Sequence, residues 1–298
     1  MIGDVSDNKG FSVIQHRSVR SVLVRLAAAA AVAVPAVVLV PSAAAMPDPA
    51  PRGAQYVSLG DSYVAAGDMG NGTNPSAGCA QAPDNVGHLV ARRMPGVSFA
   101  DWSCSGADTD DITKVTDKGP QIRGLSEKTQ YVSLSIGGND DGIFGDLIKQ
   151  CVVGALCPAG AEKDAMAKID KLEPRLDRTY AAVRAAAPNA QVAVIPYLKI
   201  LPDDPRGCFV DAVMGAPAVK SANRVQKRLN ATITEAATRA GFTVVDPNTL
   251  PGRDMCGPDG KRFLSFTGML PGENGTPIHP TLAGRKHTAK LVAAAFTR

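Results

Sequence analysis

Hydrophobic residues along the chain fall into short runs that suit buried strands and longer stretches with helical spacing. The short runs predict strands at residues 56–59, 97–102, 131–136, 192–195 and 242–245. Apolar positions at steps of three and four predict helices at 85–94, from 165 to Pro188, at 218–240 and at 281–296, with a kink or break at Pro174. Because strands alternate with helices, the pattern predicts an α/β fold with a parallel sheet covered on both faces.

Functional residues of such a fold should gather at one edge of the sheet. In open parallel sheets the ligand site lies in the crevice at the carboxyl ends of the strands. The residues to consider are therefore those that follow Leu59, Cys104, Ile136 and Val245.

The first 45 residues are typical of a secretory signal peptide. Basic residues precede an apolar run at 26–40, and Ala43 and Ala45 form an A-x-A cleavage site. A membrane anchor is the alternative, but the run is shorter than the roughly 20 residues that a span needs. We therefore expect a removed signal peptide at 1–45, a linker at 46–53, one domain at 54–298 and a secreted protein.

Composition and charge narrow the possible partners. The chain is 45% hydrophobic and 20% charged, which is the balance of a globular protein. The signal segment holds Lys9 and three arginines against Asp4 and Asp7, so its removal lowers the formal charge from +4 to +2. No basic stripe with interleaved aromatic residues is present, and we expect no nucleic-acid partner.

All six cysteines follow the signal segment. An even number of cysteines in an exported chain predicts three disulfides, and six cysteines allow fifteen connectivities. The chain has no C-x-x-C pair and no cysteine–histidine cluster, so we expect no metal site. The simplest pairing follows sequence order: Cys79 with Cys104, Cys151 with Cys157, and Cys208 with Cys256.

Ser62 follows the first predicted strand in the turn Gly60-Asp61-Ser62. There its hydroxyl could face solvent, while the next backbone amides could face an oxyanion. A helix N-cap is the alternative role. Val64 stands where the G-x-S-x-G elbow of α/β-hydrolases has its second glycine, so this is another kind of serine enzyme or none.

A serine nucleophile needs a base, and histidine is the usual one. Three histidines follow the signal segment. His88 lies in a predicted helix, and His287 has the setting of a solvated helix residue. His279 lies in a loop bracketed by Pro277 and Pro280, which constrains the backbone. Elimination favours His279, and a loop histidine without a special role is the alternative.

Donors for an oxyanion are available after the second and third predicted strands. Gly106 of Cys104-Ser105-Gly106 offers a backbone N–H, and Asn139 after Gly137-Gly138 offers a side-chain amide. Each segment alone is more often a turn. Three such segments in order, followed by a late histidine, indicate an acyl-transfer site.

These segments resemble the SGNH, or GDSL-type, hydrolase superfamily. The matching segments are Gly60-Asp61-Ser62, Gly106, Gly137-Gly138-Asn139-Asp140 and His279. The cysteines and signal segment are similar to its secreted actinobacterial lipase and esterase branch. The resemblance implies a single three-layer α/β/α domain with a flavodoxin-like sheet of about five parallel strands. It also implies a Ser62 nucleophile, a His279 base, and an oxyanion hole from the Ser62 amide, the Gly106 N–H and the Asn139 side chain, without a cofactor.

The sequence departs from the family at one position. The family usually has an aspartate three residues before the histidine, and this chain has Thr276. A triad aspartate orients the imidazole. We expect a backbone carbonyl near Thr276 to replace it in a Ser-His dyad, and a carboxylate from Asp254 or Glu273 is the rival.

Apolar residues in two loops indicate the substrate. They are Ile143, Phe144, Leu147 and Ile148 after Asn139, and Phe263, Leu264, Phe266, Met269 and Leu270 before His279. With the family branch, they favour fatty-acyl esters such as acylglycerols, although ordinary packing would explain them equally well. Phospholipase A, a carbohydrate O-acyl esterase and a non-catalytic exported binding protein are the alternatives. We expect a monomer that acts on a small-molecule or lipid ester, with at most transient contact with a lipid surface.

Overall fold

Five parallel strands form the centre of the fold. The computed structural model describes residues 48, 50–68, 78–153 and 159–298, so the predicted signal peptide and residues 46, 47 and 49 of the predicted linker lie outside the described residues. The strands are β1 (Tyr56–Gly60), β2 (Phe99–Asp101), β3 (Tyr131–Ser135), β4 (Gln191–Val194) and β5 (Thr243–Val244). They pair in the order β2-β1-β3-β4-β5, and every pairing is parallel. This is the flavodoxin-like order, as the resemblance implied.

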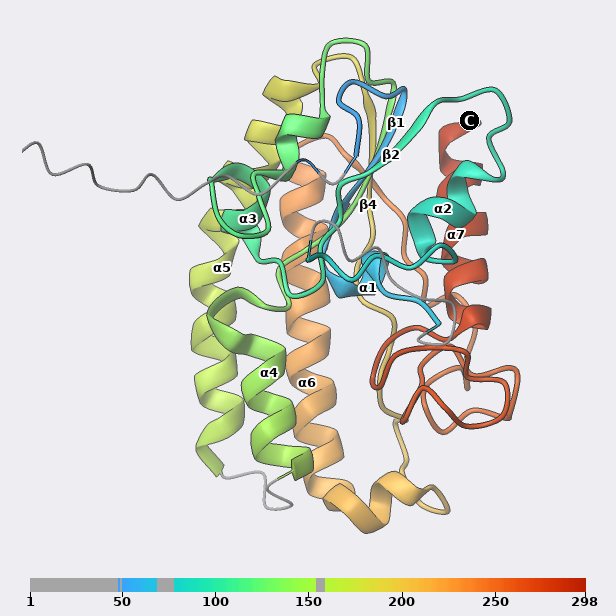
Figure 1. Ribbon diagram of the computed structural model, residues 1–298. Coiled ribbons are helices and arrows are strands. Elements are labelled where there is room, and N and C mark those ends of the chain that lie inside the picture. Colours follow the sequence, from blue (N-terminus) through green and yellow to red (C-terminus); the bar gives the residue numbers. More distant parts are fainter. Residues whose placement is uncertain (1–47, 49, 69–77, 154–158) are drawn as a thin grey trace, which may run out of the picture. The chain divides into compact units, whose positions relative to one another are not determined.

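Helices cover both faces of the sheet (Figure 1). The three long helices among the described residues are α5 (Ala159–Ala186), α6 (Phe209–Arg239) and α7 (Leu282–Phe296), and α2 (Val86–Ala91) is a short helix that precedes β2. Shorter helices follow strand ends: α1 (Ser62–Ala65), α3 (Thr109–Thr113) and α4 (Ile143–Ile148). Helices α3, α5 and α6 lie on one face, and α2 and α7 contact each other on the opposite face.

Alternation along the strands explains the two layers. On β1, Val57 and Leu59 belong to the core beneath α5 and α6, whereas Tyr56 belongs to the core beneath α2 and α7. Ser58 shares the second face, where a Cβ added at Gly87 of α2 would lie 2.8 Å from its side chain. Side chains of consecutive strand residues point to opposite faces, so one strand supplies both cores.

The helix α5 differs from its sequence prediction. It begins six residues earlier than expected, and Pro174 lies inside it without splitting it. The predicted break is wrong because residues on both sides of the proline, Ile169 and Leu176, are fully buried in the same core. The proline frees the carbonyl of the exposed residue Asp170, where water can reach it.

The helix α6 begins earlier than predicted, at Phe209. Gly215 interrupts it with φ 74° and ψ 153°, and the longer part then follows Pro217 close to the predicted start. Proline suits the first turn of a helix because its missing N–H would have no intrahelical partner. The segment before Gly215 has too few residues for its period to stand out in the sequence.

Two of the three predicted disulfides are confirmed. Cys79 pairs with Cys104 and Cys208 pairs with Cys256. The third predicted pair includes Cys157, which lies outside the described residues. None of the helices within the described part of the chain is both long and apolar enough to cross a membrane.

Candidate active site

The turn that carries Ser62 is fixed by the backbone of Gly60. Gly60 has φ 131°, and a Cβ there would lie 2.2 Å from the carbonyl oxygen of Ser135, so only glycine fits. The side chain of buried Gln121 accepts from Gly60 N at 2.7 Å and donates to Gly60 O at 2.9 Å. Ser62 is thus the first residue of α1, and the N-cap is Asp61, whose Oδ1 accepts from Tyr63 N at 2.9 Å.

The second carboxylate oxygen of Asp61 binds a tyrosine from another strand end. Tyr197, just after β4, donates its hydroxyl to Asp61 Oδ2 at 2.5 Å and accepts from the backbone N–H of Gly138 at 2.7 Å. Asp61 and Tyr197 are each only 1% exposed. Burial raises the pKa of Asp61 to about 7, although the hydrogen bonds from Tyr197 and from Tyr63 N oppose this.

His279 contacts Ser62 directly. Its Nε2 lies 2.7 Å from Ser62 Oγ, and its Nδ1 lies 2.6 Å from the carbonyl oxygen of Pro277. A carbonyl oxygen only accepts, so Nδ1 carries the proton and Nε2 is free to accept from the serine. Burial lowers the pKa of His279, partly offset by the hydrogen bond to Pro277. The imidazole is therefore neutral near pH 7, in the state that a general base requires.

A strained turn presents His279. The backbone N–H of His279 donates to the carbonyl of Thr276 at 3.1 Å, and Ile278 has φ 59°. Proline followed by a residue with positive φ is the pattern of a type II turn, which usually has glycine at the second place. A β-branched residue in this conformation is rare, and such strain clusters at functional sites. Tyr63 donates its hydroxyl to the carbonyl of Ile278 at 3.2 Å.

Arg285, on α7, anchors both ends of the segment that contains this turn. It is fully buried and donates to the carbonyl of Pro280 at 2.7 Å and to that of Asn274 at 2.9 Å. Two further donors bind Asp84, at the carboxylate (2.6 Å) and at the carbonyl (3.0 Å). The loop from 274 to 280 is therefore held by one guanidinium group.

No carboxylate hydrogen-bonds His279 among the described residues. Thr276, which stands at the position of the family aspartate, donates its hydroxyl to Gly67 O at 3.1 Å instead. Glu273 is buried and accepts from Phe266 N and Leu270 N, and Asp254 accepts from Cys256 N. The acceptor for Nδ1 is thus a backbone carbonyl one residue beyond Thr276.

Gly106 lies beside Ser62 and His279 in the same cavity. Its φ is 80°, a conformation that favours glycine. Asn139 donates one side-chain N–H to the carbonyl of Ala107, the residue after Gly106, at 2.9 Å. This bond ties the two predicted oxyanion donors to each other and leaves the second N–H of the Asn139 amide available.

The other two histidines lie elsewhere. His88 Nδ1 is 3.1 Å from Asn85 Oδ1 in α2, and His287 Nε2 is 3.0 Å from Thr249 Oγ1. Neither lines the cavity beside Ser62. In the part of the chain that the structure describes, no cluster of His, Cys, Asp and Glu is suited to hold a metal ion.

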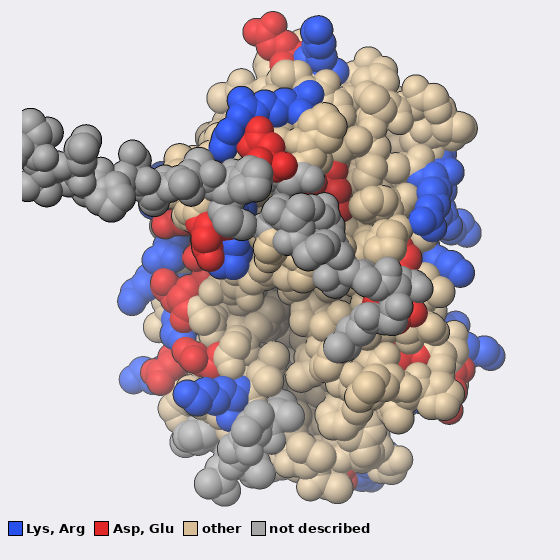
Figure 2. Space-filling view, in the orientation of Figure 1, with Lys and Arg blue, Asp and Glu red and all other residues tan. Residues whose placement is uncertain are grey.

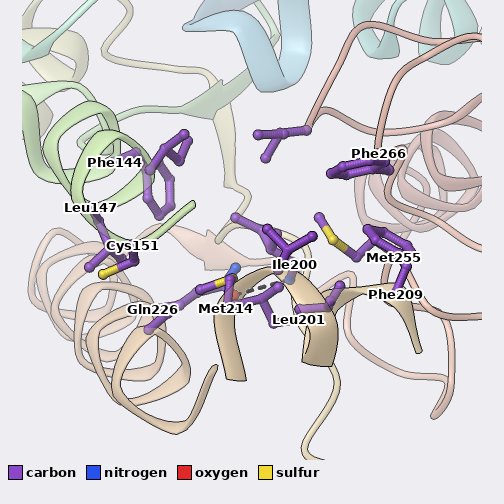
Figure 3. Close-up of a pocket in the computed structure, with 15 residues that line it drawn as sticks. Phe144, Leu147, Cys151, Ile200, Leu201, Phe209, Met214, Gln226, Met255 and Phe266 are labelled. Atoms are coloured by element: carbon purple, nitrogen blue, oxygen red, sulfur yellow. Dashed lines mark hydrogen bonds between the residues drawn. The ribbon is translucent and has the colours of Figure 1, made fainter. Parts of the chain in front are cut away.

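An apolar cavity begins at Ile278, the residue before His279. Ile278 lines it, and so does Phe144, which stacks on Tyr63 next to Ser62 at a ring distance of 6.2 Å. Figure 3 shows Phe144 and Leu147 of α4 on one side and Phe266, Met255 and Phe209 on the other. Figure 2 shows a hollow in the lower half of the molecular face, bordered mostly by uncharged residues.

The predicted apolar loop residues divide into lining and packing residues. Phe144, Leu147, Ile148 and Phe266 line the cavity. Ile143, Phe263 and Leu264 are buried in the core, and Met269 and Leu270 are exposed. The lining also includes residues that the sequence did not point to, from α6 and from the segment after β4: Ile200, Leu201, Phe209, Val210, Val213, Met214 and Ala222.

Comparisons with known proteins agree with this fold. The model of the GDSL-like Lipase/Acylhydrolase family matches residues 58–287. Lipase 2 of Streptomyces coelicolor is 32% identical over 253 residues, which cover 79% of this chain and 83% of the relative. A lipase of Streptomyces rimosus is 31% identical over 262 residues, with coverage of 87% and 92%.

Solved structures show the same likeness. A crystal structure of an extracellular lipase from Streptomyces rimosus matches with a TM-score of 0.64 at 30% identity, covering 80% of this chain and 98% of that chain. A phospholipase A1 from Streptomyces albidoflavus matches with a TM-score of 0.62 at 29% identity, covering 81% and 98%.

The fold, the site and these likenesses define a lipase-like carboxylic ester hydrolase. The chain belongs to the GDSL-like lipase/acylhydrolase family, the SGNH hydrolases.

Proposed function

We propose that the protein hydrolyses fatty-acyl esters, such as acylglycerols, through an acyl-enzyme on Ser62 with His279 as the general base. The observation that carries the proposal is the 2.7 Å contact between Ser62 Oγ and His279 Nε2, next to an apolar cavity. A hydroxyl bound to a neutral imidazole is the arrangement that activates a serine for attack.

The reaction proceeds in two matched stages. Ser62 Oγ attacks the ester carbonyl while its proton moves to His279 Nε2, and the alcohol then leaves with that proton. Water repeats the sequence on the acyl-enzyme and releases the acid. The oxyanion of each tetrahedral intermediate accepts from the Ser62 amide, the Gly106 N–H and the Asn139 side chain.

The carbonyl of Pro277 takes the place of the family aspartate in this proposal. It fixes the tautomer through the 2.6 Å bond to Nδ1, and its dipole stabilises the imidazolium that forms. A carbonyl carries only a partial charge, so it stabilises the imidazolium less than a carboxylate would, and it does not raise the resting pKa as far.

The apolar cavity favours a fatty-acyl chain over an acetyl group. Among the described residues that line it, Gln226 carries the one amide side chain, and that amide is bound to backbone. It accepts from Ile200 N at 3.0 Å (Figure 3) and donates to Leu198 O at 2.7 Å. The wall therefore offers contact with methylene groups, and each buried methylene contributes about 0.8 kcal/mol to binding.

A phospholipase A activity is the second candidate, because the matching Streptomyces albidoflavus structure is a phospholipase A1. Both substrates carry fatty-acyl chains on glycerol. They differ at the third glycerol position, which bears another acyl chain in triacylglycerol and a phosphocholine group in phosphatidylcholine. Titrating release of fatty acid from dispersed triacylglycerol and from phosphatidylcholine separates the two, and faster release from the phospholipid would replace the acylglycerol assignment.

Secretion is part of the proposal. The disulfides Cys79–Cys104 and Cys208–Cys256 suit an oxidising compartment, and a matching structure is an extracellular lipase. N-terminal sequencing of protein from culture medium should start at Met46.

Labelling with an organophosphonate tests the nucleophile. We expect one phosphonyl group per chain, located on Ser62 by peptide mapping, and neither label nor p-nitrophenyl ester turnover in Ser62→Ala. His279→Ala should lose activity to a similar degree, whereas His287→Ala should keep it. Turnover retained in Ser62→Ala would refute the proposal.

Chain-length profiling tests the cavity. Ala222 lies in the cavity wall on α6, so Ala222→Leu should shift the preferred p-nitrophenyl ester to a shorter acyl chain. Ala212, an exposed alanine on the same helix, provides the control Ala212→Leu, which should leave the profile unchanged. An unchanged profile in Ala222→Leu would place the acyl chain elsewhere.

A further inference from the structure

Tyr197 connects two turns that leave neighbouring strands. The nucleophile turn follows β1 and the turn Gly137-Gly138-Asn139 follows β3, and the register places Gly60 opposite Ser135. Tyr197 follows β4, which pairs with β3 on its far side. Neighbouring strands lie about 4.8 Å apart, so only a long side chain from β4 can pass the end of β3 to reach the turn after β1.

The hydroxyl of Tyr197 acts both as a hydrogen-bond donor and as an acceptor. It donates to Asp61 Oδ2 at 2.5 Å and accepts from Gly138 N at 2.7 Å. Asp61 is the residue before the nucleophile, and Gly138 is the residue before Asn139. One oxygen atom therefore fixes the separation of the nucleophile turn from the loop that carries an oxyanion donor.

Local packing supports this bridge. A Cβ added at Gly138 would lie 2.5 Å from the ring of Phe144 and 3.0 Å from Cζ of Tyr197, so glycine is what lets the backbone N–H reach the hydroxyl. The ring of Tyr197 meets those of Tyr63 and Phe144 edge-on, each at 4.9 Å. The ring is held on two sides, and its hydroxyl has no freedom to leave the bridge.

We propose that Tyr197 is a positioning residue that sets the distance between the Ser62 turn and the Asn139 loop. The proposal rests on the proposed function, because it assumes that these turns carry the nucleophile and an oxyanion donor. Tyr197 touches neither the ester nor His279, so it acts through Asp61 and Gly138. Loss of its hydroxyl should misplace the oxyanion donor and leave the acyl cavity intact.

The variant Tyr197→Phe tests the bridge, because phenylalanine keeps the ring packing and removes only the hydroxyl. Tyr180→Phe is a matched control: Tyr180 is also fully buried, and its hydroxyl has no hydrogen-bond partner in the described structure. The concentration of active sites in the mature secreted protein is titrated with an organophosphonate, so that kcat is expressed per active site.

We expect Tyr197→Phe to lower kcat for p-nitrophenyl butyrate about 10- to 100-fold, with KM within about twofold of wild type. The rate of phosphonylation should fall in parallel, since that reaction also builds negative charge on an oxygen at the oxyanion donors. Tyr180→Phe should match wild type in all three quantities. A kcat per site in Tyr197→Phe equal to that of Tyr180→Phe would overturn the proposal.

Asp61→Ala removes the acceptor of the Tyr197 hydroxyl, so this variant alone should lower kcat and tests the bridge if Tyr197→Phe folds poorly. Where both variants fold, they form a double-mutant cycle. Either substitution removes the hydrogen bond between Tyr197 and residue 61, so the double variant should lose little more kcat than the more impaired of the two single variants. Losses that simply multiply would overturn the proposal. Ser62→Ala distinguishes failure of the proposed function from failure of the bridge. If Ser62→Ala is active, the proposed function is wrong. If Ser62→Ala is inactive while Tyr197→Phe has the kcat of wild type, only the positioning role of Tyr197 is wrong.

Discussion

Arg285→Ala should destabilise the protein and disorganise the His279 loop together. Arg285 is fully buried, and its four hydrogen bonds reach Asp84 twice and the carbonyls of Asn274 and Pro280. Alanine would leave the Asp84 carboxylate, 13% exposed, without its cation and would free the two carbonyls at the ends of the loop.

The expected cost follows from burial. Removal of one partner from a buried ion pair costs about 3–5 kcal/mol, because the other charge stays behind uncompensated. Arg206 and Asp204 provide a control with the same 2.6 Å contact on the surface, where the two side chains are 83% and 55% exposed. Water replaces the lost partner there, so Arg206→Ala should leave the free energy of unfolding unchanged within error.

Urea unfolding followed by circular dichroism measures the free energy, and kcat per titrated site reports on the loop. Arg285→Ala should lower the unfolding midpoint strongly and reduce kcat, since the His279 turn loses its anchor. Arg285→Lys keeps the charge but reaches fewer acceptors, so it should fall between alanine and wild type. Equal midpoints for Arg285→Ala and Arg206→Ala would refute the reasoning.

Three further predictions concern pH and cross-linking. Since burial lowers the pKa of His279, kcat/KM should rise with pH to a plateau with a midpoint below 6.5; a higher midpoint would contradict the assignment of the base. Burial raises the pKa of Asp61 to about 7, so the folded state binds the carboxyl proton more tightly than the unfolded state does. This contribution to the free energy of unfolding is complete below the unfolded pKa and is lost as pH rises through 7. The wild type should therefore lose as much as about 4 kcal/mol relative to Asp61→Asn between pH 4 and 8 in urea titrations, and a pH-independent difference would contradict this. Replacing Cys208 and Cys256 by serine opens a cross-link across 48 residues, and the free energy of unfolding should fall by roughly 4 kcal/mol.

Hydrophobic patterning predicts much of this fold because strands and helices have different periods. All five strands were predicted, and their parallel pairing followed from the alternation with helices. The β5 strand shrinks to Thr243–Val244, since it lies at the sheet edge and pairs only with β4. The short helix α4 was not predicted, because its six residues directly follow the turn at 137–140 and its apolar side chains were assigned to a loop.

The sequence predicts those site residues whose position follows from the order of the strands. Ser62, Gly106 and Asn139 each follow a strand end, so their order in the sequence brings them to one edge of the sheet. The sequence offered Tyr197 and Arg285 no comparable signal, because Asp61 lies 136 positions from Tyr197 and Asp84 lies 201 positions from Arg285. Their roles depend on which strands and loops become neighbours in space.

The acceptor for His279 Nδ1 illustrates why spacing alone falls short. The family spacing points to Thr276, but its side chain donates to the carbonyl of Gly67. The Nδ1 proton of His279 is accepted by the backbone carbonyl of Pro277, and a sequence does not reveal such a partner because every residue has a carbonyl. What selects that carbonyl is the positive φ of Ile278, which folds Pro277 back towards the imidazole. A backbone carbonyl can serve as the acceptor only if the turn that carries it is rigid, whatever the side chain at that position. This explains why Arg285, Tyr63 and the proline ring all act on the same segment. In the proposed mechanism, the rigidity of the loop does the orienting for which the family usually has an aspartate.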